Sequence, residues 1–373
     1  MQLRDLPTPC VLVDRARVER NIERMQAAAG ARGLRLRPHA KTHKSVEFAR
    51  LQIERGAVGI CCAKLGEAEV FADAGVRDIR LPYPLNPVNA PRVLGLLDRS
   101  RLSFIVDHMD VARGWSEAMT AAAREVDVLV KVDVGFHRCG INPMAPDASE
   151  FVTTVARLKG LRFRGLLSHA GHAYGAMSDD EAAAIARAEA GILTGLAARV
   201  RAAGVAVEEI SVGATPTARF SAREEGITEL RPGNYIYYDR TQVALGAAAW
   251  RDCALTVLAR VVTVHSPDRV IFDSGSKTLT NDLARGATNP QGFGAVLTSV
   301  DSDEPDDTLV IERLSEEHAT VRAARPSRLE PGDFVRIVPN HSCVVSNLVD
   351  HVWVVDGDRV IERMDVSARG RIT

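Results

Sequence analysis

One segment of the chain concentrates basic and imidazole side chains, Arg37-Pro38-His39-Ala40-Lys41-Thr42-His43-Lys44. The ε-amine of a lysine can form an imine with a carbonyl cofactor, and neighbouring histidines can handle protons. Lys41 lies between two histidines and is therefore the candidate for this role. For a lysine taken alone, a solvated basic loop that binds an anion is the alternative.

Two further segments carry side chains suited to acid–base chemistry. Arg138 lies in a loop with glycines on both sides, Gly135 and Gly140, and a guanidinium suits a phenolate or carboxylate oxygen. His169-Ala170-Gly171-His172-Ala173-Tyr174 places two imidazoles and a phenol close together, which is a typical acid–base platform. A structural role for Arg138, or for one of the histidines, remains the alternative.

Two short segments combine glycine with small or hydroxyl-bearing residues, Gly213-Ala214-Thr215-Pro216-Thr217 and Arg231-Pro232-Gly233-Asn234-Tyr235. The backbone N–H groups of such loops hold phosphate in many barrel enzymes. The segments therefore predict a phosphate cradle, and ordinary turns are the alternative.

A His-x-Cys pair, His341 and Cys343, follows a predicted strand late in the chain. Side chains alternate along a strand, so the imidazole and the thiolate are expected on the same side. Both groups are good Zn²⁺ ligands. Two protein ligands leave positions for water, substrate or a further side chain, as in a catalytic zinc site.

The elements that would position these groups fall into two regions. From about residue 32 to 238, short apolar runs alternate with amphipathic helical segments such as Val46–Arg55, Gly66–Ala74, Ser116–Glu125 and Asp179–Ala203. The eight expected strands are Leu34–Pro38, Val58–Ala63, Asp78–Pro82, Leu102–Asp107, Val126–Val134, Phe163–His169, Glu209–Gly213 and Leu230–Tyr237. Strands separated by helices form parallel sheets, and eight such units predict a closed (β/α)8 barrel over residues 15–243. A doubly wound open sheet is the alternative.

The rest of the chain, residues 244–373 together with 1–14, is expected to form a mostly β domain. Its predicted strands are Ala254–Val264, Arg269–Phe272, Thr308–Glu312, Ala319–Ala323, Phe334–Val338 and His351–Val355, with Pro9–Asp14 from the N-terminus. Asp356-Gly357 predicts a hairpin turn.

The barrel prediction brings the reactive segments together. Reactive groups of such barrels lie at the carboxyl ends of the strands, and the segments around Lys41, Arg138, His169 and Thr215 each follow a predicted strand. The first and eighth strands are neighbours in a closed barrel, so Lys41 should lie beside the phosphate cradle. A phosphorylated aldehyde cofactor needs this arrangement.

Composition excludes several other classes of protein. The net charge is −1, which argues against nucleic acid as a partner. Charged residues interrupt the longest apolar runs, so no membrane span is expected, and the N-terminus lacks the pattern of a signal peptide. Six scattered cysteines fit a reducing compartment better than a disulfide framework. A cytoplasmic location is therefore expected.

These motifs, in this order along nearly the whole chain, are similar to those of the D-threonine aldolase and D-serine dehydratase family. The resemblance rests on Pro-His-Ala-Lys-Thr-His-Lys at 38–44, Arg138 in its glycine-flanked loop, 213–217, 231–235 and the late His-x-Cys. It implies an alanine-racemase-like, fold-type III architecture that binds pyridoxal 5'-phosphate (PLP), usually in a homodimer.

The resemblance also implies roles for individual residues. Lys41 would carry PLP, with His39, Arg138 and His169 around it. The phosphate would be surrounded by Gly213, Ala214, Thr215, Gly233, Asn234 and Tyr235. His341 and Cys343 would hold a divalent metal, with Zn²⁺ favoured over Mn²⁺ because of the thiolate, and the metal would bind the β-hydroxyl of a small D-amino acid.

The reaction expected from the resemblance is dehydration of D-serine or D-3-hydroxyaspartate. Cys343 and the His169–Tyr174 loop resemble the dehydratases of the family, whose aldolases more often have Asp as the second metal ligand. In this reading Lys41 removes the α-proton, and His172 and Tyr174 are further catalytic candidates.

Three alternatives remain. The first is retro-aldol cleavage to glycine and an aldehyde, with His172 as base. The others are an amino acid racemase and a non-catalytic cofactor-binding protein. Val344-Val345-Ser346-Asn347 and Ala214 depart from the usual family residues, and these departures leave the substrate side chain open.

Overall fold

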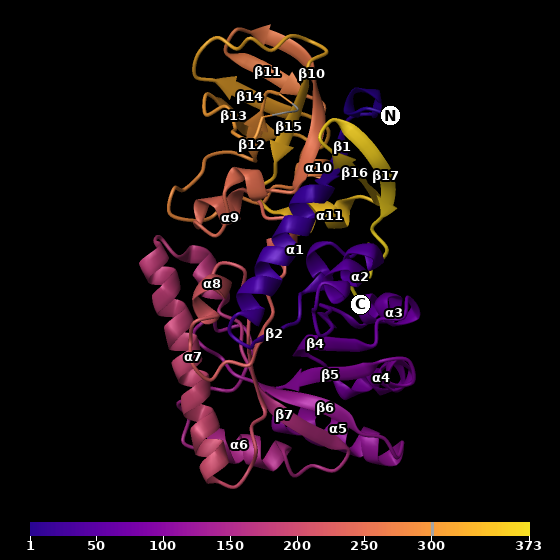
Figure 1. The fold of residues 1–373 in the computed structure, drawn as a ribbon, viewed down its shortest axis with the longest axis vertical. Helices are drawn as coiled ribbons and strands as arrows, with labels where there is room; N and C mark the ends of the chain where they lie inside the picture. Colours follow the sequence, from indigo (N-terminus) through magenta and orange to yellow (C-terminus); the bar gives the residue numbers. More distant parts are fainter. Residues whose placement is uncertain (300–301) are drawn as a thin grey trace.

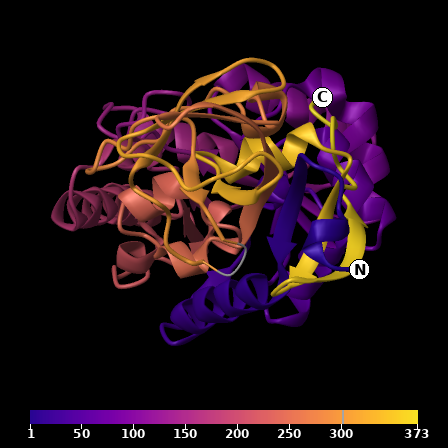
Figure 2. The ribbon, with the colours of Figure 1, turned by 90° about the horizontal axis from the view of Figure 1, so that it is seen from above.

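The computed structural model describes residues 1–299 and 302–373. Within these residues, one sheet has eight parallel strands and the other has nine strands that pair mostly antiparallel. Figure 1 shows the two sheets stacked along the long axis of the molecule, with helix α1 (Arg15–Gly30) running from one to the other. Seen from above, the antiparallel sheet lies over the barrel (Figure 2).

The parallel sheet has the strand order β2-β9-β8-β7-β6-β5-β4-β3. Its strands are β2 (Arg35–Leu36), β3 (Ile60–Cys61), β4 (Asp78–Pro84), β5 (Arg101–Val106), β6 (Val126–Lys131), β7 (Leu161–Leu167), β8 (Glu209–Val212) and β9 (Glu229–Leu230). The edge strands β2 and β3 are joined by hydrogen bonds from Val58 N to Leu36 O (2.9 Å) and from Cys61 N to Pro38 O (2.7 Å). The sheet therefore closes on itself, which confirms the predicted barrel.

Helices cover the outside of this barrel. They are α2 (Val46–Glu54), α3 (Leu65–Asp73), α4 (Ala90–Leu97), α5 (Met109–Ala121), α6 (Ala148–Val155), α7 (Asp179–Ala202) and α8 (Ala218–Ser221). The longer ones bury an apolar stripe against the strands, as Trp115 of α5 and Leu193 of α7 do, because apolar residues recur at the helical period. Within the described residues, no helix is both long and apolar enough to cross a bilayer.

Two predicted element boundaries are wrong. The helix expected over Ser116–Glu125 begins at Met109, where the His108 ring accepts a hydrogen bond from Asp110 N, and ends at Ala121. The strand expected over Leu230–Tyr237 ends at Leu230, and Asn234–Ile236 forms a 3-10 turn instead. Apolar and aromatic side chains made this segment resemble a strand, although tertiary contacts bury them in a turn.

The antiparallel sheet combines the N-terminal strand with the last third of the chain. Its path is β13-β14-β11-β10-β1-β16-β17, and β15 joins β12 to β10. The bounds are β1 (Cys10–Asp14), β10 (Leu255–Ser266), β11 (Arg269–Phe272), β12 (Ala295–Leu297), β13 (Leu309–Leu314), β14 (Ala319–Ala323), β15 (Phe334–Val338), β16 (His351–Asp356) and β17 (Arg359–Asp365). The hairpin at Asp356-Gly357 has the predicted place, with Gly357 at φ +57°.

Short helices link this sheet to the barrel. They are α9 (Arg240–Ala244), α10 (Ser276–Leu279) and α11 (Ser342–Leu348). The C-terminus returns to the barrel, where Thr373 O accepts a hydrogen bond from Gly66 N of α3.

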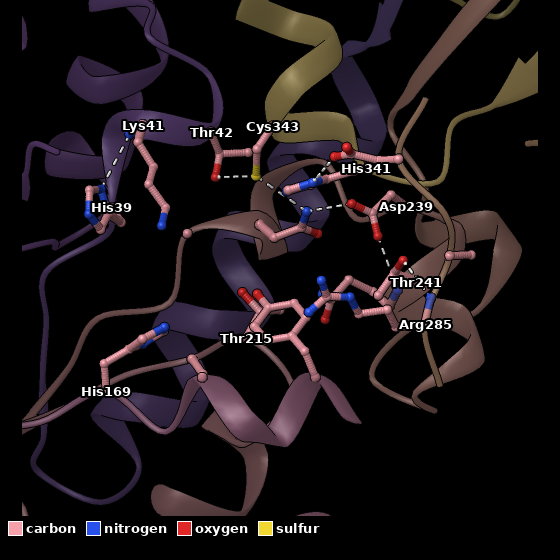
Figure 3. A pocket seen from close by; sticks show the side chains of 18 of the residues that line it. His39, Lys41, Thr42, His169, Thr215, Asp239, Thr241, Arg285, His341 and Cys343 are labelled. Carbon is pink, nitrogen blue, oxygen red and sulfur yellow. Dashed lines mark hydrogen bonds and ion pairs between the residues drawn. The ribbon is translucent and has the colours of Figure 1, made fainter. Parts of the chain in front are cut away.

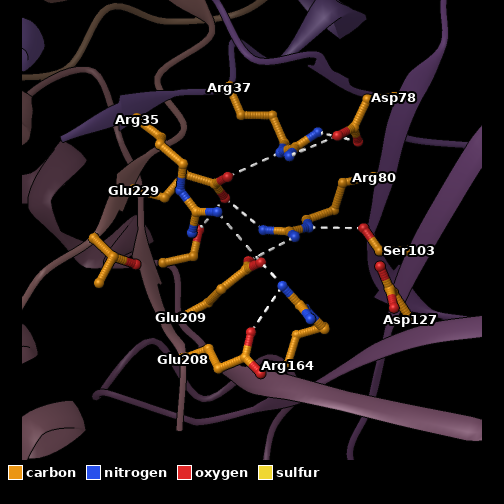
Figure 4. Close-up of polar contacts among 12 residues, drawn as sticks. Arg35, Arg37, Asp78, Arg80, Ser103, Asp127, Arg164, Glu208, Glu209 and Glu229 are labelled. Carbon is orange, nitrogen blue, oxygen red and sulfur yellow. Dashed lines mark hydrogen bonds and ion pairs between the residues drawn. The ribbon is translucent and has the colours of Figure 1, made fainter.

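The interior of the barrel contains a buried ion-pair network rather than only apolar side chains (Figure 4). Glu229 accepts hydrogen bonds from Arg37 Nε at 2.9 Å, from Arg80 and from Ser211 Oγ at 2.6 Å. Ser211 Oγ in turn accepts from Arg231 Nε at 2.7 Å. Burial would raise the pKa of Glu229, but Arg80 and Arg37 outweigh burial and lower this pKa from 4.5 to about 2.

Glu229→Gln should destabilise the protein by about 3 kcal/mol at neutral pH, because it leaves buried guanidinium groups unpaired. A carboxylate with a depressed folded-state pKa stabilises the fold above its unfolded-state pKa and loses this effect as it protonates. The difference from the native protein should therefore shrink as the pH falls from about 4.5 towards 2.

Urea unfolding at several pH values measures this difference. The neighbouring Glu208→Gln is the control, since Glu208 pairs with Arg164 at the surface and should cost less than about 1 kcal/mol. Equal effects of the two variants would contradict a stabilising role for the network.

Candidate functional site

A cavity of about 760 Å³ lies where the carboxyl ends of the barrel strands meet the antiparallel sheet. Its walls come from both regions (Figure 3). Most of the residues singled out from the sequence line it: His39, Lys41, Arg138, His169, Tyr174, Ala214, Thr215, Gly233, Asn234, His341 and Cys343.

Lys41 lies on a 3-10 turn, Ala40–Thr42, that directly follows the first barrel strand. Ala40 and Thr42 are buried whereas Lys41 is exposed, so the turn directs this one side chain into the cavity (Figure 3). Lys44, at φ +50°, is also buried, and its Nζ pairs with Glu67 Oε1 at 3.1 Å. This buried ion pair fixes the end of the turn to α3.

The Lys41 turn is joined to helix α11 of the other sheet. Ser346 Oγ donates a hydrogen bond to the carbonyl of Thr42, and Thr42 Oγ1 lies 3.2 Å from Cys343 Sγ. Asn234 Nδ2 donates to Ser342 Oγ at 3.1 Å. These contacts hold the lysine and the His-x-Cys pair in one cavity.

The two histidines nearest Lys41 are held neutral. Burial, together with the charge of Lys41 and Arg231, lowers the pKa of His39; burial, Lys131 and Lys41 do the same for His169. The Nδ1 of His169 contacts Gly213 O, and because a carbonyl only accepts, Nδ1 carries the proton and Nε2 keeps a free lone pair. Neutral imidazoles can donate or accept hydrogen bonds without adding charge to a basic cavity.

One end of the cavity has features that suit an anion. The Thr215 hydroxyl is buried in its wall, beside the Tyr174 side chain. Gly233 packs against the Lys41 segment so closely that a Cβ would lie 3.0 Å from His39 Cβ and 3.1 Å from Thr42 Oγ1. A hydroxyl and a closely packed glycine thus lie beside the Lys41 segment, which fits a phosphorylated aldehyde.

Arg138 and Lys131 come from the fifth repeat of the barrel. The Arg138 guanidinium lies 5.1 Å from the centroid of the Phe136 ring, at the exposed edge of the cavity. Lys131 is buried behind it, and burial together with Arg231 lowers the pKa of its amine to about 7. Lys131 was not predicted as a site residue, because no motif surrounds it and it lies within a predicted apolar strand.

His341 and Cys343 are adjacent, but not for the predicted reason. Strand β15 ends at Val338 and α11 begins at Ser342, so His341 precedes a helix and strand alternation does not apply. A hydrogen bond between the two side chains lowers the pKa of Cys343 against the effect of burial. Burial alone would lower the pKa of His341, but Cys343, Asp239 and Asp282 raise this pKa to about 10.

Three expected site residues do not reach the cavity wall, His172, Gly213 and Tyr235. His172 lies against the 133–137 loop, where a Cβ on Gly135 would be 3.6 Å from its Cε1. The Tyr235 hydroxyl accepts a hydrogen bond from Gln52 Nε2 at 2.9 Å inside the fold. Gly213 acts through its backbone, since its carbonyl accepts from His169.

Other residues that line the cavity were not expected from the sequence: Asp239, Thr241, Gln242, Asp282 and Arg285. Asp282 Oδ2 lies 2.7 Å from His341 Nδ1. These residues belong to α9 and to the loop after α10, which carry no repeat, glycine signature or histidine cluster. Only the packing of the two sheets brings them to the site.

Comparison with known proteins agrees with this geometry. Residues 13–241 match the family model of the alanine racemase N-terminal domain, and residues 254–355 match a putative serine dehydratase domain. D-threonine aldolase from Arthrobacter is 35% identical, over 97% of this chain and 93% of that protein. D-threo-3-hydroxyaspartate dehydratase from Delftia is 34% identical, over 91% of each chain.

The chain belongs to the D-threonine aldolase and D-serine dehydratase family.

Solved structures of this family have the same architecture. The Delftia dehydratase superposes with a TM-score of 0.90 at 31% identity, covering 98% of both chains. D-threonine aldolase from Filomicrobium marinum also reaches 0.90, at 30% identity, covering 100% of this chain and 98% of that one. Alanine racemase from Clostridium difficile, at 14% identity and a TM-score of 0.72, shares the fold. The protein is a PLP-dependent lyase that acts on D-hydroxy amino acids.

Ser346→Ala tests the contact between the Lys41 turn and α11. The variant leaves the buried Thr42 carbonyl without its serine partner, so it should lower the free energy of unfolding by about 1 to 2 kcal/mol. Ser116→Ala is a matched control, because the exposed Ser116 hydroxyl also donates to a carbonyl, that of Lys159, and should cost less than about 0.5 kcal/mol. Chemical denaturation compares them, and indistinguishable values would argue against the contact.

Proposed function

We propose that this lyase is a D-3-hydroxy amino acid dehydratase, with D-serine and D-3-hydroxyaspartate as the substrate class. The observation that carries the proposal is the His341–Cys343 pair facing the same cavity as Lys41. An imidazole and a thiolate beside the lysine provide a place for a Lewis acid at the β-hydroxyl, which is the group that dehydration must expel.

The cavity fits PLP at both ends. Lys41 Nζ would carry the cofactor, Thr215 Oγ1 and the backbone around Gly233 would hold its phosphate, and Arg138 would lie near its ring. When bound, this cofactor withdraws electrons from the α-carbon of an attached amino acid. The buried Thr215 hydroxyl in the cavity wall and the packing of Gly233 on His39 support this assignment.

His341 and Cys343 fit a divalent metal, and the thiolate favours Zn²⁺ over Mn²⁺. Asp282 contacts Nδ1 of His341 and so leaves Nε2 for the metal, in the manner of a carboxylate–histidine–zinc unit. Solved variants of a D-threo-3-hydroxyaspartate dehydratase replace a histidine and, two positions later, a cysteine, the latter in a metal-free form. In the described residues no group of three His, Cys, Asp or Glu side chains has an arrangement that could hold a metal by itself, so substrate or water would complete the site.

The protein's own groups would then divide the work. Lys41 Nζ removes the α-proton, since it is the exposed amine that lines the described part of the cavity. The imidazoles of His39 and His169 flank Lys41. Because they are neutral, they add no positive charge that would oppose proton transfer to its amine. Tyr174 keeps its phenolic proton because burial, Cys343 and Asp239 raise its pKa, so it would donate a hydrogen bond rather than act as a base.

Retro-aldol cleavage is the second candidate function. It is favoured by the 35% identity to the Arthrobacter aldolase over 97% of this chain. The base first expected for it, His172, is not at the cavity wall, and the second ligand candidate is Cys343 rather than an aspartate. Both observations favour dehydration.

Product analysis of protein loaded with PLP and zinc distinguishes the two reactions. We expect ammonia and a 2-oxo acid from D-serine or D-3-hydroxyaspartate. Glycine and an aldehyde as the main products, from these substrates or from D-threonine, would establish the aldolase instead.

Lys41→Ala should abolish the visible absorbance of lysine-bound PLP and lower turnover by at least about 1000-fold, because no other exposed amine lines the described part of the cavity. His341→Ala should keep that absorbance, lose stoichiometric zinc and lose turnover. Absorption spectra and metal analysis measure both outcomes. A lysine adduct that survives in Lys41→Ala would overturn the assignment of the cofactor lysine.

A further inference from the structure

Arg285 lines the cavity, and the proposed reaction gives its side chain no role. The Arg285 loop connects α10 to β12 and is anchored on both sides of this residue. Ala284 is buried, and Gly286, at φ +118°, packs so tightly on α9 that a Cβ would lie 2.7 Å from the Ala244 carbonyl carbon. The backbone N–H of Arg285 donates to Thr241 Oγ1 at 3.3 Å. The backbone that carries the Arg285 side chain is therefore held in place.

The Arg285 guanidinium makes no ion pair or hydrogen bond with another residue in the described parts of the chain. Figure 3 shows it on the side of the cavity opposite Lys41. A guanidinium directed into a cavity without a partner is suited to a ligand carboxylate, which it can bind through two parallel N–H donors.

Gln242 provides a second, independent sign of a ligand at this end of the cavity. Its side chain is fully buried and lines the cavity, and its contact with the Tyr174 hydroxyl uses at most one of its two N–H donors. Buried amides are normally satisfied. A carboxylate beside Arg285 would accept a hydrogen bond from Gln242 Nε2.

The position of Arg285 relative to His341 indicates which substrate group it meets. Asp282, on the same loop, contacts His341, so the loop lies directly beside the proposed metal ligands. In the proposed function the β-hydroxyl is at His341 and Cys343. The other substituent on the same β-carbon is only one bond away and would extend toward the loop.

We propose that Arg285, with Gln242, binds a carboxylate on the β-carbon and makes the enzyme selective for D-3-hydroxyaspartate over D-serine and D-threonine. The proposal rests on the proposed function for the position of the β-carbon. Arg285 is a specificity-determining residue and takes no part in proton transfer.

Binding of D-aspartate and D-alanine to the PLP-loaded enzyme tests the proposal without turnover, because neither amino acid has a β-hydroxyl. The visible spectrum of the cofactor reports binding. Arg285→Gln should weaken D-aspartate binding by about 10- to 100-fold, the effect of losing a charged hydrogen bond, and should leave D-alanine binding unchanged. Arg285→Lys should be intermediate, and Arg325→Gln, an exposed arginine of the antiparallel sheet region, should behave like the native protein.

Two outcomes would overturn the proposal. Equal loss of D-aspartate and D-alanine binding would mean that Arg285 holds the α-carboxylate or the cofactor phosphate. Unchanged D-aspartate binding would mean that it holds neither carboxylate.

Turnover separates this proposal from the proposed function. If D-3-hydroxyaspartate and D-serine are both dehydrated and their ratio of kcat/KM is the same in Arg285→Gln, the selectivity proposal fails and the dehydratase stands. If neither is consumed although D-aspartate binding depends on Arg285, the carboxylate site stands and the proposed dehydratase fails.

Discussion

The site depends on the contact between the Lys41 turn and helix α11. Thr42 meets Ser346 through its carbonyl and Cys343 through its hydroxyl, so one buried residue of the barrel fixes two residues of the antiparallel sheet region. Neither sheet contains a complete site by itself. The barrel supplies the amine, the imidazoles and the phosphate cradle, whereas the other sheet supplies the imidazole–thiolate pair and the loop with Arg285.

Burial limits the positive charge of the cavity, because it keeps the histidines there neutral. Lys41, Arg138 and Arg231 make the barrel side cationic, which suits a phosphorylated cofactor and a carboxylate substrate. The histidines beside them stay neutral because burial and these cations lower their pKa values. Beneath the cavity, Ser211 Oγ accepts a hydrogen bond from Arg231 and donates one to Glu229. The buried ion pairs of the barrel interior thus position a cationic residue of the site as well as filling the core.

The sequence predicts what depends on local pattern. Eight apolar runs separated by helical segments identify the barrel, and once the barrel is assumed, the rule that reactive groups follow strand ends places Lys41 beside the phosphate segments. Side-chain direction in irregular segments is not predictable in this way. His172 lies in the expected loop but outside the cavity wall. Tyr235 was predicted in a strand, and the 3-10 turn that forms there instead keeps its side chain inside the fold. Asp282 and Arg285 carry no local signal at all, since only the packing of the loop on α9 brings them to the cavity.

The most direct test of a shared site for cofactor and metal is a crystal structure of the protein prepared with PLP and zinc, with anomalous data collected at the zinc edge. The account predicts density continuous from Lys41 Nζ to the cofactor and an anomalous peak between His341 and Cys343 in the same cavity. A cofactor attached to another lysine, or zinc bound away from this pair, would contradict it.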